Sequence, residues 1–171
     1  PALLDDAAVE GPRPALTGFV TTASPTPSDS AQRRGELKSL LVPASAVGGL
    51  MVRFVLRSRE SETRIREHLP TLLARLPHLA VLSLNIHPQH AAVLEGPEEI
   101  VLHGDTLTMR VDGLPLHLRP RSFFQTNTAV ATALYRQATA WIADLRPRTL
   151  WDLYCGVGGF ALHAATAPPG L

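Results

Sequence analysis

The residues best suited to chemistry are the glycines of Gly156-Val157-Gly158-Gly159, which follow an apolar run at 150–154. That run is predicted to be a short strand, and a helix is predicted over 160–167. Glycines between a strand and a helix allow a tight turn and let a cofactor approach the backbone. The amides that begin the helix favour a polar or anionic cofactor group. A Gly-x-Gly-Gly sequence alone also suits a nicotinamide cofactor or a plain tight turn, so these alternatives stay open.

The acidic residue ahead of the turn, Asp152, favours S-adenosylmethionine as the cofactor. Its carboxylate could accept a hydrogen bond from the cationic amino group of that cofactor, or balance its charge. The alternative is an ordinary aspartate at the end of a strand. We therefore take Asp152, Gly156 and Gly158 as candidate cofactor-binding residues.

Cysteine and histidine offer little further chemistry. Cys155 is the one cysteine of the chain, so an internal disulfide and a multi-cysteine metal cluster are excluded within these residues. Inside a glycine-rich turn we expect a small buried thiol rather than a nucleophile. His87 and His90 lie close in sequence but have no cysteine or carboxylate partner motif, so no metal site is predicted.

Length and composition suit a soluble globular protein. The 171 residues, of which 45% are hydrophobic and 18% charged, suffice for one domain or for a small domain plus part of another. No apolar run is long enough for a membrane span. The start has neither a signal-peptide pattern nor a methionine, so we expect residue 1 not to be the natural N-terminus.

The charge pattern is only weakly informative. The net charge is +1, although Lys38 is the sole lysine among 16 basic residues. Arginine forks bind phosphates in a bidentate way that an ammonium cannot. The nucleotide composition of the gene explains the same usage, so charge alone does not indicate a nucleic-acid partner.

The elements that must position the glycine turn begin after a weakly patterned start. Residues 1–34 show no sustained period; a short helix over 2–9 is one alternative, and 21–30 is predicted to be loop or linker. The apolar runs 37–42 and 50–56 are predicted to pair as a hairpin.

A helix is predicted over 61–76, with Ser61 as its cap and with Pro70 kinking or splitting it. Alternating apolar and polar residues predict a half-buried strand at 81–86.

Short strands are predicted over 100–102, 107–111 and 114–118, and an Asp112-Gly113 turn joins the last two. With the preceding elements they predict an antiparallel α+β central domain over 35–120.

A long amphipathic helix is predicted from Asn127 to just before Pro147. Its predicted apolar face consists of Val130, Ala133, Leu134, Ala138, Trp141, Ile142 and Leu145. Helix, strand, glycine turn and helix resemble the opening of a Rossmann-like α/β domain. The predicted organisation is a linker or partial N-terminal region at 1–34, the central α+β domain, and the start of this α/β domain at 121–171, which would be a methyltransferase domain if its cofactor is S-adenosylmethionine.

Two motifs in this order resemble the family of S-adenosylmethionine-dependent RNA uracil-C5 methyltransferases. They are Ser122-Phe123-Phe124-Gln125-Thr126-Asn127 and, after a helix of fitting length, Asp152-Leu153-Tyr154-Cys155-Gly156-Val157-Gly158-Gly159-Phe160. Upstream motifs are more similar to the branch that modifies a uridine in domain II of 23S ribosomal RNA than to the transfer-RNA branch. They are Arg34-Gly35-Glu36-Leu37, Arg53-Phe54-Val55-Leu56-Arg57-Ser58, Ile65-Arg66-Glu67-His68-Leu69-Pro70 and Val93-Leu94-Glu95-Gly96. The resemblance covers about 35–168.

The resemblance implies a reaction and a domain plan. Proteins of this family carry an N-terminal iron–sulfur or RNA-binding region, a central α+β unit and a C-terminal catalytic domain. A cysteine thiolate attacks carbon 6 of uracil, carbon 5 takes the methyl group, and a base removes the carbon-5 proton. By the resemblance, the cysteine that provides the thiolate, the residue that acts as the base and the acidic residue that binds the cofactor ribose all lie beyond Leu171. We therefore expect a truncated, inactive fragment that holds no ligands for an iron–sulfur cluster.

The resemblance also implies site residues. Gln125 and Tyr154 would line the cofactor pocket; the alternatives are a polar residue at a helix start and a buried strand aromatic. Phe123 could stack on a flipped base, and Arg121 could bind an RNA phosphate or belong to a charged rim. For Phe123 and Phe124, core packing of at least one is the stronger interpretation.

The resemblance thus implies that the parent protein is a monomeric, cytoplasmic enzyme that transfers a methyl group from S-adenosylmethionine to carbon 5 of a uridine in 23S ribosomal RNA, without membrane association. Two alternatives remain: a non-catalytic RNA-binding module and a methyltransferase that acts on a small molecule.

Overall fold

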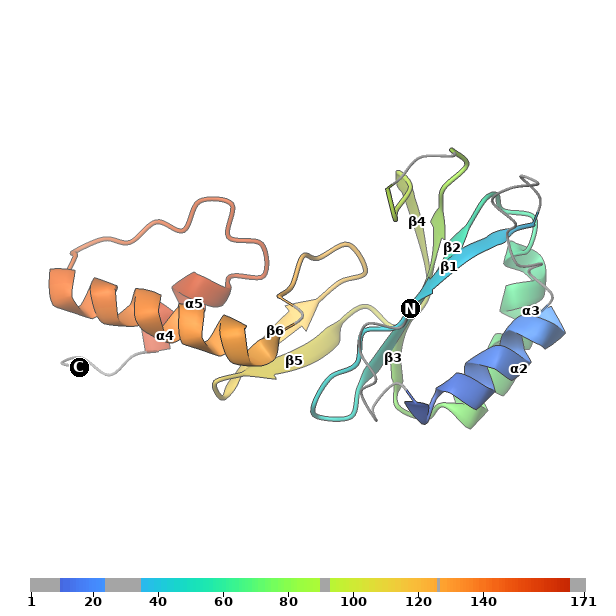
Figure 1. Ribbon diagram of the computed structural model, residues 1–171, viewed down its shortest axis with the longest axis horizontal. Helices are drawn as coiled ribbons and strands as arrows, with labels where there is room; N and C mark the ends of the chain where they lie inside the picture. The colour runs from blue at the N-terminus through green and yellow to red at the C-terminus, as the bar shows by residue number, and fades with distance from the viewer. Residues whose placement is uncertain (1–9, 24–34, 90–92, 126, 167–171) are drawn as a thin grey trace. The chain divides into compact units, whose positions relative to one another are not determined.

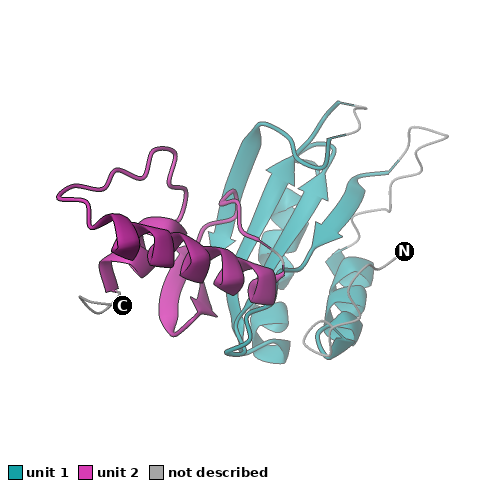
Figure 2. Cartoon of the chain, turned by 60° about the vertical axis from the view of Figure 1, so that its left-hand side comes forward, with its two compact units in different colours: residues 1–107 teal, residues 108–171 magenta. Residues whose placement is uncertain are grey.

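The computed structural model describes residues 10–23, 35–89, 93–125 and 127–166. The chain forms two compact units, Pro1–Leu107 and Thr108–Leu171, which Figure 2 shows in different colours. Both units combine helices with strands, so the fold is mixed α/β (Figure 1). No helix among the described residues combines the length and the apolar character that crossing a bilayer requires.

The first unit contains a four-stranded sheet in the order β1-β2-β3-β4. Strand β1 (Leu37–Leu41) pairs antiparallel with β2 (Leu50–Leu56), which confirms the predicted hairpin. Strand β2 runs parallel to β3 (Leu79–Ile86), and β3 runs antiparallel to β4 (Glu98–His103). The expectation of an antiparallel sheet is therefore wrong. Helix α3 (Glu62–Arg75) returns the chain to the edge where β2 began, so β2 and β3 point the same way.

Helix α2 (Arg13–Ala23) lies in the region expected to lack sustained periodicity. Its buried residues are Leu16, Phe19 and Ala23. Pro14 stands in its first turn, where the amides of a helix have no partner, so the proline removes no hydrogen bond. The predicted loop over 21–30 is therefore wrong at its start. Residues 2–9 and 24–30 lie outside the described residues.

Helix α3 confirms the predicted helix, with two differences. It continues through Pro70, because Ile65 and Leu72 on either side of the proline are buried in the core. Ser61 precedes the helix and is fully buried, yet its side chain makes no cap hydrogen bond. Ser61 therefore occupies the predicted N-cap position, and its carbonyl accepts from the Ile65 amide at 3.0 Å, but its hydroxyl has no partner among the described residues.

Helices α2 and α3 lie on the same face of the sheet (Figures 1 and 2), and the core lies between them and the strands. Alternate strand residues point to this face. Those of β2 and β3 are Leu50, Val52, Phe54, Leu56, Leu82, Leu84 and Ile86. Ser83 and Asn85, which alternate with them, are buried too. The expectation of a half-buried strand is therefore wrong, because β3 is an inner strand with both faces covered.

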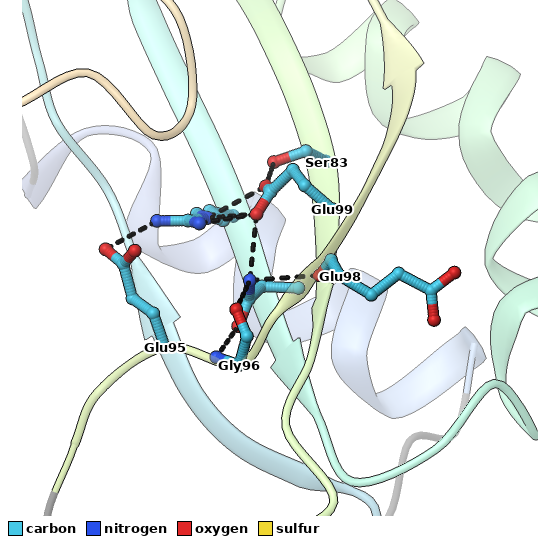
Figure 3. Close-up of polar contacts among 7 residues, drawn as sticks. Ser83, Glu95, Gly96, Glu98 and Glu99 are labelled. Atoms are coloured by element: carbon cyan, nitrogen blue, oxygen red, sulfur yellow. Dashed lines mark hydrogen bonds and ion pairs between the residues drawn. The ribbon is translucent and has the colours of Figure 1, made fainter.

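A buried polar network surrounds Arg53 on the sheet face away from the helices (Figure 3). The guanidinium donates to both carboxylate oxygens of Glu99 and lies 2.6 Å from Glu95. Asn85 donates to the Gly96 carbonyl (3.1 Å) and accepts from the Gly96 amide (2.6 Å). Burial by itself would lower the pKa of Arg53, but its hydrogen bonds to Glu99 and Glu95 raise that pKa above its ordinary value. The network thus stabilises a buried cation and ties the segment before β4 to the sheet.

The second unit contains a hairpin followed by two helices. Strands β5 (Leu107–Val111) and β6 (Leu114–Leu118) match the predicted strands. Their turn, Asp112-Gly113, has φ angles of 50° and 83°, and a type I′ turn requires positive φ at both positions. Helix α4 (Thr128–Leu145) and helix α5 (Gly159–Thr166) confirm the two helices predicted there.

The hairpin packs with helix α4 in one small cluster, which we call the hairpin–helix core. Its buried residues are Val111, Leu116, Leu118, Ala131 and Tyr135. The hairpin therefore belongs to the same compact unit as the helices that follow it. The predicted domain over 35–120 instead combined the hairpin with the four-stranded sheet.

Helix α4 does not bury the face that its periodicity predicts. Leu134, Trp141 and Leu145 of that face are 45%, 62% and 78% exposed. The buried residues are instead Ala131 and Tyr135, because the hairpin contacts a neighbouring stripe of the helix.

Candidate functional site

The glycine-rich loop before α5 has the backbone geometry of a tight turn. Gly156 and Gly158 have φ angles of 58° and 78°. The Gly158 amide donates to the Cys155 carbonyl at 2.8 Å, and the Leu162 amide donates to the Gly158 carbonyl at 2.9 Å. A Cβ atom built on Gly156 would meet nothing within 4 Å. The loop therefore has open space beside its backbone, as the approach of a cofactor requires.

Asp152 ties the beginning of this loop to helix α5. Its Oδ2 accepts a hydrogen bond of 3.1 Å from the Ala161 amide, in the first turn of the helix. Amides in that turn have no partner within the helix, so the carboxylate satisfies one of them. Its Oδ1 has no hydrogen-bond partner among the described residues and can accept from a cationic ligand.

The strand predicted at 150–154 is absent from this part of the described chain. A strand needs a neighbour to complete its hydrogen-bond ladder, and no described strand pairs with this segment. Trp151, Leu153 and Tyr154 are 77%, 72% and 104% exposed. Tyr154 also has a φ of 61°, which is uncommon for a residue with a side chain. Such backbone strain is found preferentially at ligand-binding sites.

Cys155 is exposed, so the expectation of a buried thiol is wrong. Its neighbours in the loop, Tyr154 and Gly156, both have positive φ, and this tight path leaves the Cys155 side chain outside the hairpin–helix core. Its Sγ lies 3.9 Å from the Gly156 carbonyl oxygen, which is a weak contact within the loop itself.

Tyr135 of helix α4 supports the end of the loop. Its ring stacks on that of His163 at 4.5 Å and meets the Phe160 ring edge-on at 4.8 Å. A Cβ atom on Gly159 would lie 2.6 Å from Tyr135 Cζ, so only glycine fits there without displacement. Burial raises the pKa of Tyr135. The last glycine of the motif is therefore explained by packing against Tyr135.

His163 joins α5 to the hairpin. Its Nδ1 lies 2.6 Å from the Gly159 carbonyl oxygen, and its Nε2 lies 3.2 Å from the Val111 carbonyl oxygen. Because a neutral imidazole has one N–H, both contacts are hydrogen bonds only when the ring is protonated. The contact with Gly159 lies within α5, whereas the contact with Val111 joins α5 to strand β5.

An exposed ion pair links the hairpin turn to α4. Arg136 donates from Nε and Nη2 to the two oxygens of Asp112, at 2.7 and 2.5 Å. These hydrogen bonds lower the pKa of Asp112 and raise that of Arg136.

The segment before α4 carries the other candidate residues. Phe124 packs against the hairpin–helix core, which confirms that one of the two phenylalanines is a packing residue. Phe123 is 77% exposed, and Arg121 and Gln125 are exposed as well. Asn127 caps α4 by accepting from the Val130 amide at 3.0 Å.

The hairpin–helix core brings the two candidate segments together. Phe124 from the first segment and Val157 from the glycine loop both pack against it. No hydrogen bond or ring contact among the described residues joins Gln125 to Tyr154, so their shared pocket stays a prediction.

Three supporting residues escaped the sequence-based prediction: Tyr135, Val157 and His163. Tyr135 does not belong to the predicted apolar face of α4, and His163 is one of several histidines that are scattered along the sequence. In the sequence, only Gly159 indicated such a contact. A third glycine that the turn itself does not need indicates that another residue packs closely against the backbone there.

The sequence comparisons identify relatives over most of this chain. No protein-family model matches it. A 23S rRNA (uracil(747)-C(5))-methyltransferase of Halothiobacillus neapolitanus is 56% identical over 146 residues, which are 84% of this chain and 38% of that protein. Proteins of the same name from Edwardsiella ictaluri and Cronobacter sakazakii are 53% and 52% identical over 154 residues, covering 89% of this chain and 41% of each relative. The chain thus spans about two fifths of the length of these curated relatives.

A solved structure shares the fold. The tRNA (uracil-54, C5)-methyltransferase of Pyrococcus abyssi, in complex with S-adenosyl-L-homocysteine, matches with a TM-score of 0.70 at 20% identity, over 91% of this chain and 36% of that one. This likeness shows the fold alone, whereas identities above 50% over most of the chain show common descent. The chain therefore belongs to the RNA uracil-C5 methyltransferase family.

Proposed function

We propose that the protein transfers a methyl group from S-adenosylmethionine to carbon 5 of a uridine in 23S ribosomal RNA. The names of the relatives describe methylation of carbon 5 of a uracil in 23S ribosomal RNA, and the structural neighbour is bound to S-adenosyl-L-homocysteine. Within that reaction, the described chain would contribute the first cofactor loop and an RNA-facing segment. The cytoplasm, where ribosomal RNA is made, is the proposed location, and the proposed state is a monomer.

One observation carries the proposal for this chain. Phe124 and Val157 pack against the same hairpin–helix core, so the segment at 121–125 and the glycine loop share one support. Substrate and cofactor must meet within reach of each other, and a shared support is how a protein holds two binding segments in fixed geometry.

The residue types at the glycine-rich loop suit S-adenosylmethionine. Gly156 leaves open space beside the backbone, and Asp152 offers a carboxylate oxygen to an ammonium group. The exposed ring of Tyr154 and the amide of Gln125 are proposed to contact the cofactor as well. S-adenosylmethionine supplies the methyl group when it is bound.

Phe123 and Arg121 are proposed to contact the RNA. An exposed aromatic ring can stack on a base taken out of its helix, and a guanidinium can bind a backbone phosphate. Cys155 is proposed not to be the nucleophile, because the family resemblance assigns that role to a thiol outside residues 1–171. Any iron–sulfur region is likewise proposed to lie outside this chain.

The test of the cofactor site is a calorimetric titration with S-adenosylmethionine, using the protein extended to the length of its relatives. Gln125→Ala should weaken binding by about 1–3 kcal/mol if a buried hydrogen bond is lost. Tyr154→Ala should weaken it through lost contact area. Trp151→Ala is the matched control, because this exposed aromatic of the same loop is not part of the proposed pocket. Wild-type affinity in both site variants would show that the pocket lies elsewhere.

The test of the reaction is incubation with labelled S-adenosylmethionine and unmodified 23S RNA. We expect label at carbon 5 of a uridine with the extended protein and none with residues 1–171 alone. Label transferred by residues 1–171 would make Cys155 the nucleophile, since the chain holds one cysteine.

A further inference from the structure

We propose that the edge of the four-stranded sheet where β2 and β3 end carries a binding site for a phosphate group of the RNA backbone, formed by Lys38 and Arg57. The identity of the anion as RNA rests on the proposed function. The site itself rests on the geometry of the first unit.

Topology brings the two cations to one edge. Strands β2 and β3 are parallel, so their C-terminal ends meet there, and Arg57 and His87 are the next residues of the chain. The His87 amide donates to the Leu56 carbonyl at 2.7 Å, which holds the two ends together. Strand β1 begins at the same edge, since Leu37 pairs with Leu56.

A bulge in β1 directs Lys38 toward this edge. Leu37 pairs with Leu56 and Ser39 pairs with Val55, so Lys38 is the extra residue between them. Bulges change the direction of a side chain and occur preferentially at sheet edges and beside functional sites.

The contacts of Lys38 hold its ammonium in place without neutralising it. Its Nζ lies 2.7 Å from His87 Nδ1 and donates to the Gln89 carbonyl at 2.5 Å. The ammonium is a donor only, so Nδ1 accepts and the ring proton is on Nε2. Both partners are uncharged acceptors. One of the three ammonium N–H groups is left without a partner among the described residues, and it can donate to an oxyanion.

The electrostatic setting favours an anion. Burial and, after it, the neighbouring Arg57 cation lower the pKa of Lys38. Both effects disfavour the charged ammonium, and a bound anion would offset both. Arg53 on the same sheet shows the contrast, because two carboxylates compensate its charge.

Two carboxylates described near this edge, those of Glu36 and Glu98, have other partners. Glu36 Oε1 accepts from the amide and the hydroxyl of Ser58, each at 2.6 Å. Glu98 pairs with Arg59. Neither carboxylate contacts the Lys38 ammonium, whose two partners among the described residues are uncharged.

A phosphodiester fits this pair of cations. An ammonium binds a phosphate oxygen as a point charge, and a guanidinium can bind two oxygens at once. Such contacts position a nucleic acid without reading its sequence. Inorganic phosphate has the same chemistry, so the experiment must distinguish the two sources.

The single lysine of the chain makes the site directly observable. Protein grown with lysine carrying ¹³C at Cε gives one side-chain NMR signal, that of Lys38. The 171-residue chain is titrated with a short uridine-rich oligoribonucleotide, with inorganic phosphate, and with chloride at matched ionic strength. We expect a saturable shift with the oligoribonucleotide, a weaker one with phosphate, and none with chloride.

Variants test whether the contact contributes to binding. Lys38→Gln should weaken oligoribonucleotide binding about tenfold, as expected for a lost hydrogen bond to a charged group, and should lower the salt dependence by about one charge. Arg57→Gln should act in the same direction. Lys38→Arg should retain most of the affinity. Arg66→Gln is the control, because it removes an equal charge from the exposed surface of α3.

The outcomes separate this proposal from the proposed function. RNA that binds the chain, as measured by fluorescence anisotropy, without moving the Lys38 signal would overturn the site and leave RNA binding intact. A shift with phosphate alone would overturn the assignment to RNA. No shift with either ligand would overturn the site entirely, whereas the methylation assay decides the proposed function independently.

Discussion

The two units differ in how completely they bury their apolar residues. In the first, every residue of β2 is buried, and α2 and α3 cover one face of the sheet. In the second, apolar side chains of α4 such as Trp141 and Leu145 are 62% and 78% exposed. Periodicity predicts α3 of the first unit and α4 and α5 of the second, but not α2. The difference teaches that periodicity in the sequence identifies the apolar face of a helix. The neighbouring elements then determine which face is actually buried.

The glycines of the two units also differ in how closely other atoms pack against them. Gly96 in the first unit lies against the backbone of β3, where a Cβ atom would lie 2.6 Å from the His87 Cα atom. Gly156 in the second unit has open space around it. Close packing explains the first glycine, whereas only the turn and an approaching ligand explain the second.

The largest expected effect compares one leucine from each unit. Leu84→Ala, in β3, should lower the free energy of unfolding by about 2–5 kcal/mol, because it leaves a cavity in a closed core. Leu134→Ala, on α4, should change it by less than about 0.5 kcal/mol, because that side chain already contacts solvent. Urea unfolding followed by circular dichroism, with hydrogen exchange of the β3 and α4 amides, measures both. An equal decrease in the free energy of unfolding for both variants would show that the two units do not differ in this way.

A smaller effect tests the one tightly packed contact of the glycine loop. Gly159→Ala should destabilise the second unit by about 1–3 kcal/mol, because the new methyl group overlaps the Tyr135 ring. In a Tyr135→Ala background the same substitution should be nearly neutral. Gly156→Ala serves as the control: its cost comes from positive φ and should not depend on Tyr135. Hydrogen exchange of the α5 amides measures the three single variants and the two double variants, and additive effects at 159 and 135 would argue against the contact.

The smallest effect concerns the titration of Tyr135. The chain has two tyrosines, so Tyr154→Phe leaves an absorbance change on ionisation that belongs to Tyr135 alone. Burial raises its pKa above the ordinary value of 10.0. The neutral phenol is thus favoured by folding, and its contribution to stability is complete below pH 10 and lost as pH rises through the folded-state pKa. A midpoint at or below 10 would show that this ring is not held in the core of the second unit.

Much of the local structure follows from the sequence because it depends on near neighbours. The Asp112-Gly113 dipeptide predicts a type I′ hairpin, since both positions tolerate positive φ. Asn127 predicts the start of α4, since its side chain can reach an amide three residues on. The motifs around Phe124 and Gly156 predict the family, which the relatives then show.

Other predictions failed because contacts distant in sequence decide them. Whether β3 is parallel or antiparallel to β2 depends on where α3 returns the chain, and the strand patterns are compatible with both. A strand at 150–154 requires a neighbour for its hydrogen bonds, which its own apolar pattern does not guarantee. The exposure of Cys155 likewise depends on the path of the loop and not on the residue type.

The sequence by itself determined helices α3, α4 and α5, the hairpins, the glycine-rich loop and the family to which they belong. Each of these depends on residue types within one or two turns of chain. Only the tertiary structure decided that Lys38 meets His87, that Tyr135 packs on Gly159, and that Phe124 and Val157 share one core. The partners in these contacts are far apart in sequence, so their approach depends on strand order and burial, which no local pattern encodes.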